Sequence, residues 1–76
     1  MKGDYEIKAV WDPAARVWVA SSKEVPGLCT EAETLEMLIE KLRMIVPELL
    51  QANGVIVPPH QLSFHIVSER TEMVEV

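Results

Sequence analysis

One stretch of the sequence decides what kind of fold this chain can form. Between residues 34 and 54, apolar side chains recur every three or four positions. On a helix with 3.6 residues per turn they fall within one stripe about 100° wide. The stripe is formed by Leu35, Leu38, Ile39, Leu42, Val46 and Leu49, and it runs on to Asn53. Because a single amphipathic helix must bury its stripe against another element, the remaining residues have to supply that surface.

The predicted helix has recognisable ends. The Thr34 hydroxyl can accept a hydrogen bond from a free N–H group of the first turn, and Glu36 suits the positive end of the helix dipole. Asn53-Gly54 predicts the C-terminal end, with Gly54 in the left-handed conformation. Pro47 falls inside the helix, on the side opposite the apolar stripe.

A β-hairpin is predicted over residues 4–21. Residues 5–11 alternate, with Tyr5 and Trp11 on the same side, and "VWVAS" at 17–21 is the return strand after an Asp-Pro turn. The sequence leaves the register open between pairing Trp11 with Val17 and pairing Val10 with Val17.

The return strand is apolar on both sides, with Val17 and Val19 on one and Trp18 and Ala20 on the other. In either register a large apolar group faces away from the expected core. Two interpretations stay open: an ordinary surface tryptophan, or a second face that is buried by a partner or a second copy. Trp18 is therefore a candidate partner-binding residue.

Two further short strands are predicted. Pro26-Gly27 marks a turn before residues 28–30, where we expect Cys29 to be a small buried hydrophobe. Its carboxylate-rich surroundings disfavour a reactive thiolate. Residues 62–68 alternate as the last strand, with His65 facing solvent. The segment 55–60 is expected to be extended but not a central strand, because it contains two prolines, and 69–76 is either an edge strand or a frayed tail.

These elements predict the fold class. The order is strand, strand, short strand, helix, strand, within a single domain over residues 1–76. We expect an α+β fold with a three-stranded antiparallel sheet, one helix packed on one face, and a further strand.

Composition excludes several classes of protein. The net charge is −5, which opposes direct binding to nucleic acid, and one cysteine cannot form an intrachain disulfide. No apolar run is long enough to span a membrane and the N-terminus has no signal-peptide core, so we expect a cytoplasmic protein. A chain of 76 residues buries only about 60 % of its unfolded surface, which favours a homodimer.

The sequence predicts no enzyme and no cofactor. His60 and His65 would need further ligands to hold a metal ion, and the serines stand in no nucleophile motif. With three glycines in the chain, no glycine-rich phosphate loop is present.

The helix carries an unusual polar face. Met37 and Met44 fall opposite the apolar stripe, among Glu36, Glu40 and Glu48. The simplest interpretation is two methionines at the boundary of the core. Because methionine adapts to many surfaces, an acidic face with two of them also suits binding of a basic protein.

Residues 11–42 resemble the HicB antitoxin family, and more closely a sister family of small uncharacterised bacterial domains. The resemblance rests on Asp12 in the turn, Trp18-Val19, Pro26-Gly27, the short strand 28–30 and the helix start Thr34-Leu35-Glu36. It implies a fold similar to a truncated double-stranded-RNA-binding domain.

The resemblance also implies a function. HicB proteins bind and block HicA, a small basic ribonuclease toxin, and full-length members add a C-terminal DNA-binding module that has no counterpart in residues 1–76. We therefore expect a non-enzymatic HicB-like interaction domain, dimeric, that neutralises a basic HicA-like toxin. The alternative is a stand-alone dimeric domain that binds another protein or a small ligand and has no toxin partner.

Overall fold

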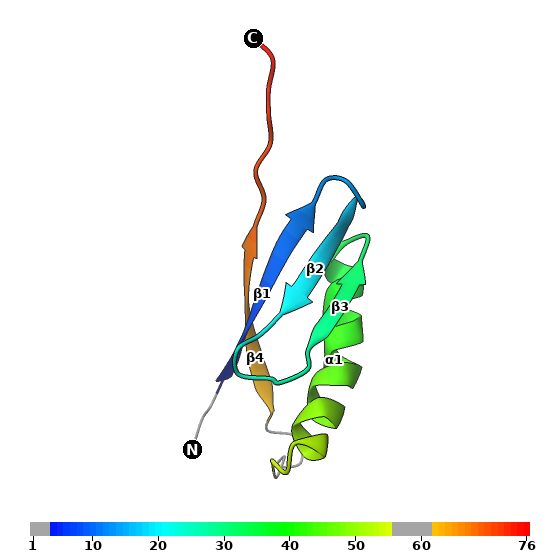
Figure 1. Ribbon diagram of the computed structural model, residues 1–76, viewed down its shortest axis with the longest axis vertical. Coiled ribbons are helices and arrows are strands. Elements are labelled where there is room, and N and C mark those ends of the chain that lie inside the picture. The colour runs from blue at the N-terminus through cyan, green and yellow to red at the C-terminus, as the bar shows by residue number, and fades with distance from the viewer. Residues whose placement is uncertain (1–3, 56–61) are drawn as a thin grey trace.

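The computed structural model describes residues 4–55 and 62–76, and within them one helix lies against one sheet (Figure 1). The elements are β1 (Asp4–Asp12), β2 (Val17–Ser21), β3 (Cys29–Ala32), α1 (Leu35–Ala52) and β4 (Ser63–Glu69). The sheet has the strand order β3-β2-β1-β4, in which β4 is parallel to β1 and the other neighbours are antiparallel. The predicted α+β class and the predicted element order are confirmed.

The hairpin register differs from both expected pairings. Asp12 lies opposite Val17, and Trp11 lies opposite Trp18. Because opposite residues point to the same face of a sheet, both tryptophans lie on the side that the helix covers. Their rings meet edge to face, with centroids 5.4 Å apart.

The turn explains this register. One Asp12 carboxylate oxygen accepts hydrogen bonds from the N–H groups of Ala14, at 3.0 Å, and Ala15, at 3.2 Å. The Asp12 carbonyl also accepts from the N–H of Arg16 at 2.7 Å, and Arg16 takes a left-handed φ of 59°. This closes a connection of four residues, 13–16, and fixes the register one residue away from the Trp11–Val17 pairing and two residues away from the Val10–Val17 pairing.

The helix ends where the sequence predicts. The Thr34 hydroxyl accepts a hydrogen bond from the N–H of Met37 at 3.1 Å. At the other end Gly54 has a φ of 80° and donates to the Gln51 carbonyl at 3.1 Å, while Val55 donates to the Leu50 carbonyl at 2.9 Å. This pair of bonds is the Schellman motif, which satisfies carbonyls that the helix leaves free.

The core lies between α1 and the inner face of the sheet. The helix buries a row spaced by four residues, and it packs over the β2–β3 half of the sheet. The row consists of Leu38, Leu42, Val46 and Leu50. Leu50 was not in the predicted stripe, because a row with this spacing turns by about 40° at each step and so runs obliquely around the helix.

The loop before β3 closes one end of this core. Val25 is completely buried, and the N–H of Leu28 donates to its carbonyl at 3.1 Å. Gly27 has a φ of 85°, as expected after a proline in a tight turn. The side-chain amide of Asn53 donates to the Pro26 carbonyl at 3.3 Å, which ties the loop to the end of the helix.

The last strand takes a position that the sequence left open. β4 runs beside β1, with Tyr5 opposite Phe64 and Ile7 opposite Ile66. His65 is exposed, as predicted. Most of the segment expected to be extended, including Pro58, Pro59 and His60, lies outside the described residues. Residues 70–76 form no regular element and run on from β4, away from the rest of the fold (Figure 1).

The prediction that Cys29 is buried is wrong. Ala32 is the buried residue of β3, so Cys29, three positions earlier, points to the opposite face and is exposed. The core position assigned to it is taken by Leu28, which is 6 % exposed. In so short a strand the apolar pattern does not define which side faces inward.

Leu42 lies completely buried in the middle of the helix, so Leu42→Ala should destabilise the protein strongly. We expect the free energy of unfolding to fall by about 2–5 kcal/mol in denaturant titrations. Met44→Ala, on the exposed side of the same helix, is the control and should change it by about 0.5 kcal/mol or less. Equal effects of the two changes would mean that the helix packs through a different face.

The exposure of Cys29 predicts rapid modification of its thiol. In the folded protein, a thiol reagent should label Cys29 at a rate close to that of the chain unfolded in guanidinium chloride. Cys29→Ala should change the free energy of unfolding by about 0.5 kcal/mol or less. Strong protection of the thiol in the folded state would contradict its placement on the outer face.

Candidate interaction surfaces

The predicted binding residues of the helix gather on one exposed face. Met37 is 49 % exposed and Met44 is 71 % exposed. The carboxylates that accompany them, Glu36, Glu40 and Glu48, are exposed as well. At 100° per residue these five positions span an arc of about 120°, on the far side of the helix from its buried row. We call these five residues the acidic helix face.

Two cations lie near this face, and each already has a partner. Arg43 forms an exposed ion pair with Glu40, with 3.3 Å between nitrogen and oxygen. The ammonium group of Lys41 donates to the backbone carbonyl of Glu31 in β3 at 2.5 Å. The acidic helix face therefore keeps an excess of negative charge around its methionines.

Trp18 does not belong to any exposed surface. It is 9 % exposed and lies in the core beneath the helix, opposite Trp11. The expected placement of Trp18 on a face away from the core is wrong, because it depended on a register that turned one tryptophan outward. Its contact with a partner stays a prediction.

The outer face of the sheet carries valines instead. Val10 and Val19 lie opposite each other on neighbouring strands, and Val67 follows on β4. Val10 is 40 % and Val67 38 % exposed, while Val19 is partly buried. Lys8 forms an exposed ion pair with Glu69 across this face, at 3.4 Å. The second apolar face that the sequence indicated therefore exists, but it is built from small side chains.

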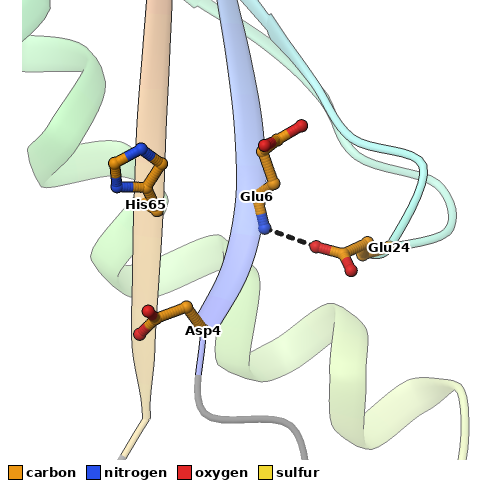
Figure 2. A pocket seen from close by; sticks show the side chains of 4 residues that line it. All are labelled: Asp4, Glu6, Glu24 and His65. Carbon is orange, nitrogen blue, oxygen red and sulfur yellow. Dashed lines mark hydrogen bonds between the residues drawn. The ribbon is translucent and has the colours of Figure 1, made fainter.

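A shallow hollow lies at the lower end of the same face, and sequence analysis missed it. It is lined by Asp4, Glu6, Glu24 and His65 (Figure 2). Two of the residues come from β1, one from β4 and one from the loop after β2. The alternation of the strands places Glu6 and His65 outward, but only the parallel register of β1 and β4 brings them opposite each other.

Hydrogen bonds hold the rim of this hollow. Glu24 accepts from the backbone N–H of Glu6 at 2.6 Å, which Figure 2 shows as a dashed line. The Ser22 hydroxyl donates to the Glu6 carbonyl at 2.6 Å, and it accepts from the N–H of Glu24 at 3.0 Å. Asp4 accepts from the Ser63 hydroxyl. These bonds tie the loop and β4 to β1. The side chains of Glu24, Ser22 and Asp4 therefore stabilise the fold.

The last surface is the segment that follows β4. Arg70 lies over the ring of Trp11, with 4.1 Å from its guanidinium carbon to the ring centroid, and it pairs with Glu72 at 3.0 Å. Beyond it Met73 is almost fully exposed and Val74 is largely exposed.

Within residues 4–55 and 62–76, no group of three or more His, Cys, Asp or Glu side chains is arranged to hold a metal ion. In the same residues, α1 is neither apolar enough nor free enough of charge to cross a membrane.

Comparison with known proteins places the chain in a family. Residues 4–76 match the model of a family described as a domain of unknown function (DUF1902), and the chain belongs to this family. It is similar to the crystal structure of hypothetical protein TTHA1013 from the extremely thermophilic bacterium Thermus thermophilus. The two sequences are 45 % identical over 96 % of this chain and 99 % of that one, with a TM-score of 0.72. No curated protein matches the sequence.

Proposed function

We propose that this member of a family of unknown function is a non-enzymatic protein-interaction domain that binds a basic protein. Following the HicB-like pattern of the sequence, the proposed partner is a small basic HicA-like ribonuclease, which the domain would neutralise. The observation that carries the proposal is the acidic helix face, where two exposed methionines stand among three carboxylates.

The apolar part of this face would supply binding energy. Met37 and Met44 expose about half or more of their surface, although both are large hydrophobic side chains. A partner that covers them removes apolar surface from water, and the flexible thioether chain fits irregular surfaces.

The charges would supply speed and selectivity. The whole chain carries −5, and the carboxylates of the acidic helix face add a local field of the same sign. A basic partner is attracted before contact, which raises the association rate, whereas nucleic acid is repelled.

The polar groups of the hollow support a structural role more than a catalytic one. The Glu24 carboxylate, which lines the hollow, accepts a hydrogen bond from the backbone N–H of Glu6, and the neighbouring Ser22 hydroxyl bonds to the backbone of Glu6 and of Glu24. The hollow, of about 330 Å³, is at the lower end of the range for small-molecule sites. It is nevertheless where a small ligand would bind if the alternative function holds, that of a stand-alone domain without a toxin.

Charge reversal on the acidic helix face tests the proposal. Glu36→Lys, Glu40→Lys and Glu48→Lys should each slow association with a recombinant HicA-like ribonuclease and weaken the complex, measured by surface plasmon resonance at two salt concentrations. Glu31→Lys is the matched control, because it changes the net charge equally but lies on β3, on the outer face of the sheet. It should slow association less and leave dissociation unchanged.

The methionines provide a second arm of this experiment. Met37→Ala and Met44→Ala should speed dissociation and leave the salt dependence of association as it was. If the toxin binds all five helix variants and the control alike, the acidic helix face is not the interface. If no HicA-like protein binds the unmodified domain, the toxin assignment fails and the alternative gains support.

A further inference from the structure

The segment after β4 is extended, carries the apolar residues Met73, Val74 and Val76, and touches little of its own chain. It continues the direction of β4 beyond the sheet (Figure 1). Met73 is 98 % and Val74 is 79 % exposed, so these hydrophobic side chains gain nothing from the fold of a single chain. Monomeric proteins seldom present such residues on an open strand, because it invites pairing with another strand.

The strand that precedes this segment has a free edge. In β1, both the N–H and the carbonyl of Glu6 bond to the loop after β2, so this residue points its backbone groups away from β4. Its neighbours Tyr5 and Ile7 therefore point theirs toward β4. In a parallel pair the residues opposite them, Phe64 and Ile66, direct their own N–H and carbonyl groups outward, to the free edge.

We propose that two copies of the chain pair along residues 63–76 as antiparallel strands, related by a two-fold axis at Arg70. In a symmetric antiparallel pair, residues whose backbone groups point to the free edge lie opposite residues of the same kind in the second copy. Even-numbered residues therefore pair with even-numbered ones. The axis then passes through a residue, and positions 69, 70 and 71 are the choices that cover most of β4. This inference does not depend on a toxin partner.

The axis at residue 70 matches apolar with apolar on both faces of the sheet. On the inner face Phe64 lies opposite the second copy's Val76, and Ile66 lies opposite its Val74. Phe64 and Ile66 are only partly buried in one chain, because the helix covers the other half of the sheet. Val74 and Val76 of the second copy would bury the exposed parts of Phe64 and Ile66 on this half of the sheet.

The outer face matches equally well in this register. Val67, which is 38 % exposed, lies opposite the second copy's Met73. His65 lies opposite Glu75, a pair that can form a hydrogen bond. Both pairs occur twice because of the symmetry.

The neighbouring registers lose these matches. With the axis at residue 69, Ile66 would face Glu72 and His65 would face Met73. With the axis at residue 71, Val67 would face Glu75 and Glu69 would face Met73. Each alternative places an apolar side chain opposite a charged or polar one, so the register at residue 70 is favoured.

Arg70 itself can tolerate a position on the axis. Its guanidinium group lies over the Trp11 ring and is paired with Glu72 of its own chain, so each positive charge is already compensated. The result is one continuous sheet of two four-stranded halves, with both helices on the same face.

Disulfide trapping tests the register directly. In the proposed pairing Val67 and the second copy's Met73 form a non-hydrogen-bonded pair, whose Cα atoms lie about 4.5 Å apart. That spacing accepts a disulfide. Within one chain the two positions are about 20 Å apart along an extended strand, so they cannot be bridged. The variant Cys29→Ser, Val67→Cys, Met73→Cys should therefore form a covalent dimer under mild oxidation.

Two matched variants separate the registers. Val67→Cys with Thr71→Cys reports an axis at residue 69, and Val67→Cys with Glu75→Cys reports an axis at residue 71, both in the Cys29→Ser background. Little covalent dimer should form in either. Preferential trapping of one of these, or equal trapping of all three, would overturn the proposed register.

Solution measurements test whether the pairing exists without a covalent link. The unmodified protein should sediment as a dimer at micromolar concentration, and Val74→Asp should raise the dimer dissociation constant at least about tenfold. Val55→Asp is the control, because it makes the same change at an exposed valine after the helix and should leave the dimer intact. A monomeric unmodified protein, or equal effects of both substitutions, would overturn the proposal.

Discussion

The register of the β1–β2 hairpin is the constraint on which the rest of the structure depends. Asp12 sets this register, because its carboxylate and its backbone carbonyl both accept hydrogen bonds from N–H groups of the turn. With Asp12 opposite Val17, both tryptophans and the small residues Ala9 and Ala20 face the helix. A slip of one residue would exchange the faces of β2, place Val17 and Val19 under the helix, and leave Trp18 in water.

The elements could be predicted from the sequence because their signals are local. The helix has a threonine cap at one end and Asn-Gly at the other, and the turn before β3 has Pro-Gly; each residue type acts on its own neighbours. The register could not be predicted, because it depends on a left-handed φ at Arg16, a residue type that rarely adopts one. The place of β4 beside β1 is a contact between residues far apart in the sequence, so no local pattern encodes it.

The candidate surfaces divide in the same way. The acidic helix face follows from helical periodicity alone, so the sequence located its five residues on one side of the helix. Trp18 was misplaced because its face depended on the register. The hollow with Glu6 and His65 was missed, because it exists only through the parallel pairing of two strands. A surface that lies on one element can thus be predicted from the sequence, whereas a surface formed by several elements cannot.

The bond from Lys41 to the Glu31 carbonyl has a consequence for how far the sheet can grow. Glu31 lies in β3, the edge of the sheet opposite to β4, and the helix lysine occupies a backbone acceptor there. A strand that approached this edge would have to displace an ammonium group and would find only four residues to pair with. One edge of the sheet is therefore open to another chain and the other is capped. A protein with this asymmetry can form a closed pair, whereas two open edges would allow chains to add without limit and produce fibres.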